Sequence, residues 1–156
     1  MSDDQLFFAL EAAYGTFALD ARFRGVETAY ATRGLTEDTA LDTPWVDNTV
    51  ADLRDAPSAV VSAYVAKASK AGVRCVLLVK VQANADWWHS YAVKKCYRIN
   101  FIRGQRPLAT LEFGPTMRGS PLIDSWDISK WELPSMDRVE LLRRRAATDK
   151  LITGRG

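Results

Sequence analysis

The chain has 156 residues, of which 47% are hydrophobic and 26% are charged. This length fits one globular domain with a substantial core, and this composition argues against a disordered or fibrous protein. The longest apolar run, CVLLV at residues 75–79, is far too short to cross a bilayer, and MSDDQLFFALEAAYG lacks the basic stretch that opens a signal peptide. We therefore expect a cytoplasmic protein that does not bind a membrane.

The net charge of +2 is unevenly distributed along the chain. Residues 1–60 carry four arginines and eleven acidic residues, a net charge of −7, whereas residues 61–136 carry +6 and residues 137–156 carry +3. A basic face is compatible with nucleic-acid binding, but Lys and Arg also solvate helix faces in proteins that bind no nucleic acid. Charge alone leaves both interpretations open.

Apolar spacing and turn residues predict the elements of the first half of the chain. In chain order we expect a helix in DQLFFALEAAY, a short strand at 16–20, an irregular segment at 21–45, a strand at 48–53 and a helix at 58–71. Asp3 or Asp4 is the expected N-cap of the first helix, and Gly15 fits the position after its last turn. In the turn DAPS, Ser58 is the expected cap of the next helix.

The second half of the chain continues the alternation of strands and helices. We expect a strand at 73–81, a short helix at 85–95 capped by Asn84 or Asp86, a strand at 97–102, a looser segment at 104–121, a strand at 122–128 and a final helix from Ser135. The run VRCVLLVKV is almost continuously apolar, which is typical of a strand buried on both faces of a parallel sheet. This order predicts a three-layer α/β fold with a mostly parallel sheet, of the Rossmann type. Residues 135–156 form a basic helix and tail of the same domain as residues 1–134.

The two cysteines and the single histidine give no metal-site signature. Cys75 lies in an apolar strand pattern and Cys96 lies near a helix end, so we interpret both as reduced, structural thiols. With one His and no Cys-x-x-Cys pair, we expect no bound metal. His89 could polarise a substrate, but it has no recognisable Asp or Ser partner in sequence, which favours a structural role.

A basic cluster with interleaved aromatic residues follows the buried strand. Its members are Lys94, Lys95, Arg98, Arg103 and Arg106. These side chains could contact DNA phosphates, or they could solvate the surface. Trp87 and Trp88 could stack on bases or wedge into a duplex, but they could equally pack against the sheet.

The segment LLVKVQANADWWHSYAVKKCYRINFIRGQRPL resembles the C-terminal half of the phage-type DNA N6-adenine methyltransferases. The matching features are the buried strand ending in Leu-Leu, the Trp-Trp-His that opens a helix, and the strand ending in Ile-Arg-Gly, with Arg106 two residues further on. Upstream, LFFALEAAYGTFALDA is similar to the opening helix and Phe-x-Leu-Asp strand of that family, and GLTEDTALDTPW is similar to its acidic, Trp-ended segment. The late strand in GSPLIDSWDI also corresponds, so the resemblance covers residues 4–130 in the right order.

The resemblance implies a methyl-transfer site that this sequence has altered. The family ends its catalytic strand in Asn-Pro-Pro-Tyr, which accepts hydrogen bonds from the adenine amine and stacks on the flipped base. Here the corresponding residues are Leu53-Arg54-Asp55-Ala56, of which only the aspartate could accept such a bond. If the chain is active, Asp55 or Asp52 would be the catalytic residue.

The resemblance also places the S-adenosylmethionine contacts at Leu19 and Asp20. Asp20 could hold the cofactor or could simply cap a turn. Arg22 and Phe23 stand where the family has small residues next to the cofactor, so binding of S-adenosylmethionine is possible but doubtful.

Two hypotheses from different classes follow from the sequence. The first is a phage-encoded, methyltransferase-like protein that has lost adenine methylation and binds double-stranded DNA or a host DNA-processing protein in the host cytoplasm, as a decoy, a regulator or a silent subunit. The second is an active S-adenosylmethionine-dependent DNA adenine methyltransferase with an atypical site. A model in which Arg22, Phe23 or Arg54 fills the pocket would favour the first. The sequence does not set the oligomeric state.

Overall fold

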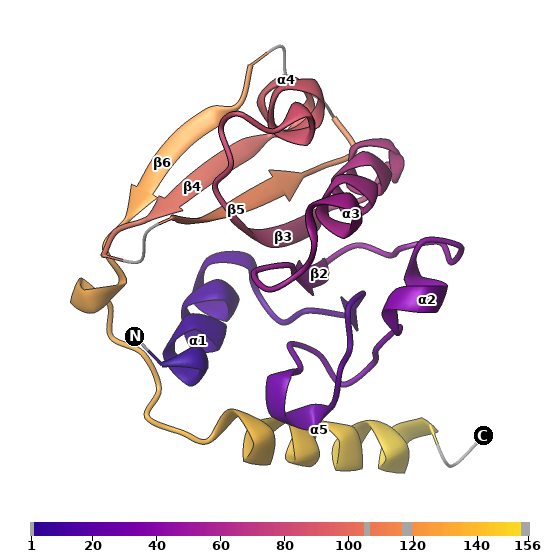
Figure 1. The fold of residues 1–156 in the computed structure, drawn as a ribbon. Coiled ribbons are helices and arrows are strands. Elements are labelled where there is room, and N and C mark those ends of the chain that lie inside the picture. The colour runs from indigo at the N-terminus through magenta and orange to yellow at the C-terminus, as the bar shows by residue number, and fades with distance from the viewer. Residues whose placement is uncertain (1, 105–106, 117–119, 154–156) are drawn as a thin grey trace.

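The fold is a mixed α/β arrangement built on a six-stranded, mostly parallel sheet (Figure 1). The computed structural model describes residues 2–104, 107–116 and 120–153. The strands lie in the order β1-β2-β3-β5-β4-β6, and β5 alone runs antiparallel to its neighbours. Their bounds are β1 Leu19–Asp20, β2 Thr49–Asp52, β3 Cys75–Lys80, β4 Arg98–Ile102, β5 Leu108–Phe113 and β6 Leu122–Trp126.

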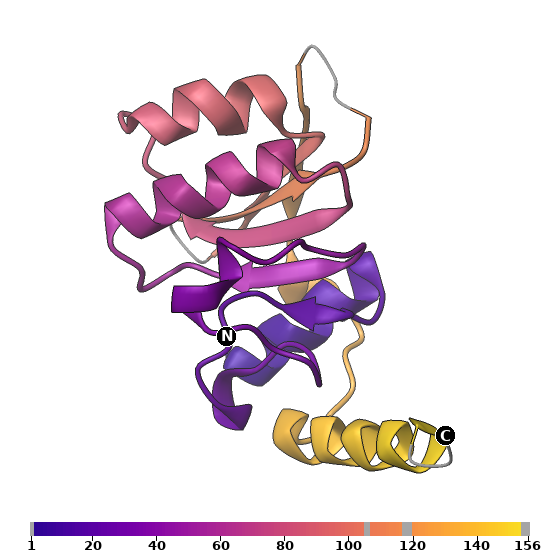
Figure 2. The same ribbon diagram turned by 90° about the vertical axis from the view of Figure 1, so that its right-hand side faces the viewer.

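Helices cover both faces of the sheet, which gives the expected three layers (Figures 1 and 2). The helices are α1 Asp3–Tyr14, α2 Glu37–Ala40, α3 Ser58–Lys70, α4 Val93–Lys95 and α5 Arg138–Thr153, with short helical turns η1 Val26–Thr28, η2 Trp88–Ala92 and η3 Ile128–Lys130. Helices α3 and α4 lie on one face and α1 lies on the other. Within the described residues, no helix is long and apolar enough to span a membrane.

Side chains of strand β3 belong to both hydrophobic cores of the molecule. Its side chains alternate between the faces, as the pleat of a strand requires. Leu77 and Val79 join the core under α3, whereas Val76 and Leu78 join the core under α1. All four are essentially inaccessible to solvent, so the expectation of a strand buried on both faces is confirmed.

The helix caps differ from those expected. Ser2, not Asp3 or Asp4, caps α1: its hydroxyl accepts a hydrogen bond from the backbone N–H of Gln5, whose side chain accepts one from the Ser2 backbone N–H. Gly15 ends α1 as expected, with a φ of 83°. Helix α3 begins at Ser58 itself after Pro57, so the Ser58 side chain does not cap it.

The looser segment expected after residue 103 contains strand β5. It pairs with β3 on one side and β4 on the other, with Leu111 opposite both Leu77 and Ile99. Pro107 precedes the strand and Gly114 follows it. Because such residues are typical of turns, the sequence predicted a loose segment here rather than a strand. The short helix expected at 85–95 contains the π-helical turn η2 before α4.

Strand β6 is an edge of the sheet. It pairs in parallel with β4, and the described residues provide no partner on its outer side. Ile123 is 62% exposed, and only Trp126 of this strand is buried. The backbone N–H of Ser125 donates a hydrogen bond of 2.8 Å to the carboxylate of Asp124.

Helix α5 lies across one end of the molecule and is joined to β6 through η3 and an extended segment (Figure 2). It begins three residues later than expected, after Asp137, whose carboxylate accepts hydrogen bonds from the next turn. Leu142 packs into the core under α1. Arg145 forms a bidentate ion pair with Glu11 of α1, at 2.6 and 2.9 Å.

Candidate functional site

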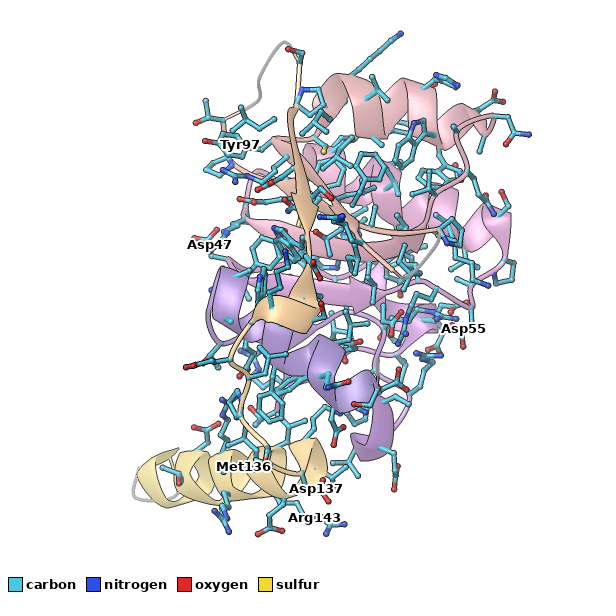
Figure 3. All side chains as sticks on the ribbon, turned by 90° about the vertical axis from the view of Figure 1, so that its left-hand side faces the viewer. Asp47, Asp55, Tyr97, Met136, Asp137 and Arg143 are labelled. Atoms are coloured by element: carbon cyan, nitrogen blue, oxygen red, sulfur yellow. The ribbon has the colours of Figure 1, made fainter. Side chains whose placement is uncertain are left out.

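The residues predicted to act at the site meet at one edge of the sheet. Strands β1, β2 and β3 are parallel, so their carboxyl ends lie together, and this is where ligands bind in open α/β sheets. Asp20 ends β1, Asp52 ends β2, and the turn after β2 carries Asp55. Figure 3 shows Asp55 at this edge, with Asp47 and Tyr97 at the opposite one.

Arg22 lies at the centre of an ion-pair network at this edge. Its side chain is only 7% exposed. Its Nε donates to Glu37 at 2.8 Å, and its Nη1 donates to the carboxylate of Asp55 at 2.6 Å and to the backbone carbonyl of Asp52 at 3.0 Å. Arg24 donates to the second oxygen of Asp55 at 2.5 Å. These guanidinium groups hold the pKa of Asp55 below its usual value.

A second arginine, Arg54, forms an ion pair with the carboxylate of Asp52 at the end of β2. Arg54 donates to Asp52 through Nε and Nη2, the latter at 2.7 Å, and it pairs with Asp3 of α1 at 3.3 Å. The hydroxyl of Tyr30 also donates to Asp52, at 3.1 Å. Asp52 therefore already has guanidinium and hydroxyl partners.

Asp20 is buried, and its carboxylate accepts hydrogen bonds from backbone N–H groups. One carboxylate oxygen accepts from the Arg22 N–H at 2.9 Å, and the other accepts from the Tyr30 N–H at 3.0 Å. This fits the turn-capping role that the sequence left open. Burial raises the pKa of Asp20 to about 6, although both backbone hydrogen bonds oppose the rise.

The space left around Arg22 and Arg54 is small, although a cavity of about 380 Å³ lies further along the carboxyl ends of the strands, lined by Val81 and residues 101–104. One cavity of about 200 Å³ is lined by residues of the network and by Arg138, and a second of about 160 Å³ is lined by the turn after β2, Lys80 and Trp87. Pockets for small organic ligands usually hold about 300–1,000 Å³. Leu19 is buried, and Phe23 packs against Gly34 so closely that a side chain could not replace the glycine.

The residues that the resemblance aligns with Asn-Pro-Pro-Tyr do not provide the amide and the aromatic ring of that motif. Leu53 is buried and its backbone N–H donates to Leu78. Ala56 offers no ring for stacking on a base. Asp55 is exposed, and both of its oxygens accept from guanidinium groups. Both Asp55 oxygens are thus held by arginines, and the neutral amide acceptor of the motif is absent at this position.

The predicted DNA-binding residues do not form one surface. On α4, Lys94 is exposed and Lys95 is half-buried, and neither has a carboxylate partner among the described residues. Arg98 lies between Glu112 and Asp124, at 3.8 and 3.9 Å. Arg103 follows the carboxyl end of β4, on the opposite edge of the sheet from α4. Arg106 lies outside the described residues.

The two tryptophans lie in the core. Trp87 and Trp88 are 3% and 7% exposed, and their rings meet edge to face 5.7 Å apart between α3 and the sheet. Packing, rather than stacking on bases, is what this arrangement provides. Both cysteines are buried and reduced, and burial raises the pKa of each thiol to about 12. No group of three or more metal ligands occurs among the described residues.

The sequence did not predict the partners of the arginines. It marked Arg22 as bulky where the cofactor would approach, but Glu37 and Asp55 lie 15 and 33 residues away from it. The only signal in the sequence was an arginine two residues after the aspartate that ends each of two neighbouring strands.

Comparison with known proteins finds no family model, no curated protein and no solved structure that matches the chain. Functional inference therefore depends on the geometry of the edge formed by β1, β2 and β3.

Proposed function

We propose that the chain is a methyltransferase-like protein that has lost adenine methylation and acts by binding DNA or a protein partner. One observation carries this proposal: Arg22 and Arg54 fill the edge where the cofactor and the adenine would meet. Both guanidiniums are fixed by several hydrogen bonds, so they are part of the packed structure. A role as decoy, regulator or silent subunit needs no open pocket.

S-adenosylmethionine does not fit the residues present. The resemblance assigns cofactor contacts to Asp20, but both of its oxygens accept backbone hydrogen bonds. The cavity beside Arg24 and Arg54, about 200 Å³, is smaller than pockets that enclose ligands of this size. We therefore derive no methyl-transfer step.

Binding of DNA is supported by cations without internal partners. Lys94 is exposed and Lys95 is half-buried, and neither pairs with a carboxylate within the described part of the chain, whereas Arg98 is paired. Lysines of this kind are available to phosphates, and such contacts make binding depend steeply on salt.

The active methyltransferase is the alternative, and one observation favours it. Asp20 and Asp52 lie at the ends of neighbouring parallel strands, where a cofactor and a substrate would be held.

Calorimetric titration of the protein with S-adenosylmethionine and with its demethylated product separates the two functions. We expect no binding heat for the wild type, because Arg22 and Arg54 occupy the site. Micromolar binding that is lost in Asp20→Asn, with the circular dichroism spectrum unchanged, would overturn the proposal. Lys70→Ala, a change of an exposed residue on α3, is the matched control.

A further inference from the structure

A large cavity lies away from the arginine-filled edge. It is a groove of about 560 Å³ between α5 and two segments of the body, residues 16–18 and 31–33. Residues 144–149 of α5 line one side of it, and residues 16–18 and 31–33 line the other. Its volume falls within the range of about 300–1,000 Å³ that is usual for ligand pockets.

Arginines dominate the charge of this groove. Arg33 is exposed and makes no side-chain hydrogen bond or ion pair with the described residues, while its backbone carbonyl accepts from Asp20 and so fixes its position. Arg144 has one carboxylate partner, Glu140, and both side chains of that pair are at least half exposed. Such exposed pairs contribute little stability, so an anion can replace Glu140 at small cost.

The other lining residues complete a site for a phosphate group. Thr16, Thr32 and Thr148 place hydroxyl groups along the wall, and Arg145 is fixed by its bidentate contact with Glu11. Asp149 is the single acidic residue of the lining, and it accepts a hydrogen bond from Thr32 at 3.3 Å.

The floor of the groove is apolar. Phe17 and Ala31 are each 3% exposed, and Ala18 is an exposed lining residue. Guanidinium groups bind phosphates through charge-assisted hydrogen bonds. An apolar floor suits the face of a base attached to such a phosphate.

We propose that this groove binds the phosphate of a nucleotide or of a nucleic-acid strand, with Arg33 and Arg144 as its ligands. The inference rests on the DNA-binding part of the proposed function and names a surface for it, separate from Lys94 and Lys95. Phosphate binding in this groove involves no residue of the edge around Arg22.

Fluorescence anisotropy with a labelled duplex, a labelled single strand and competing free nucleotide tests this inference. Arg33→Ala combined with Arg144→Ala should weaken binding and lower the slope of log K against log salt by about one per arginine. Arg143→Ala is the matched control, because Arg143 is an exposed arginine of α5 that does not line the groove. Competition by free nucleotide would identify a mononucleotide site, and its failure would identify a strand.

Each outcome decides one proposal. Loss of affinity in the double variant but not in Arg143→Ala supports the groove. Binding that is unchanged in the double variant but lost in Lys94→Ala with Lys95→Ala overturns the groove and leaves DNA binding standing. A wild type that binds no nucleic acid or nucleotide at low salt overturns both, and leaves protein binding as the function.

Discussion

Arg22 joins three separate parts of the chain through one side chain. It reaches Glu37 at the start of α2, Asp55 in the turn after β2 and the backbone carbonyl at the end of β2. Two of these partners are exposed, so solvent screens part of each interaction, but the guanidinium itself is nearly inaccessible. The side chain therefore stabilises this edge through hydrogen bonding and packing together.

Arg22→Ala should destabilise the protein by about 2 kcal/mol, because it leaves the Asp52 carbonyl and the Glu37 carboxylate without this donor and leaves Asp55 with Arg24 alone. Arg24→Ala, which removes a more exposed partner of Asp55, should cost less than about 1 kcal/mol. Urea unfolding of both variants measures the difference. Equal losses would show that burial of Arg22 adds nothing to its ion pairs.

Asp20 should titrate with a pKa near 6, well above the unfolded value of about 3.9. Between these two values the folded protein binds more protons than the unfolded chain, so the contribution of Asp20 to the free energy of unfolding grows as the pH falls through this range. It is lost as the pH rises through 6. An NMR titration of the Asp20 carboxyl carbon measures this directly, and a midpoint near 4 would contradict it.

Sequence reasoning located Asp20, Asp52 and Asp55 at one edge, and the structure brings them there. It could not assign their partners, because ion pairs between distant segments depend on the fold and leave no local pattern. It also left open whether Trp87 and Trp88 are exposed, since two adjacent aromatic residues fit either a core or a binding surface.

At the scale of elements, helices and long apolar strands were predictable because their patterns are local. Helices α1 and α3 and strand β3 have clear periodicity, and each is found within three residues of its expected bounds. Strand β5 was missed because its flanking Pro107, Gly114 and Pro115 are typical of loops. Its position depends on pairing with β3, 28 to 38 residues away at the two ends of the ladder.

Helix α5 depends on few apolar contacts. Leu142 is its fully buried leucine, whereas Leu141 is half-buried. Leu142→Ala should cost about 2–3 kcal/mol, since a buried leucine lost from a core leaves a cavity, and Leu141→Ala should cost less. Urea unfolding gives the two values, and hydrogen exchange should show faster exchange in α5 of the first variant. A larger loss at Leu141 would contradict the packing described.

At the scale of the whole molecule, the two cores share one sheet. Val76 and Leu78 face α1 while Leu77 and Val79 face α3, so loss of either core removes support from the same strand. We expect α1 and α3 to unfold together. Hydrogen exchange at low urea should give both helices the same free energy of opening, and a difference above about 2 kcal/mol would indicate separate units.

The outer side of β6 bears on how the protein behaves at high concentration. An exposed strand edge is a template on which another chain can add a strand and begin aggregation. The carboxylate of Asp124 already accepts the N–H of Ser125, and its charge lies next to the exposed Ile123. We therefore expect Asp124 to act as a gatekeeper residue, one that disfavours the addition of a second chain at this edge.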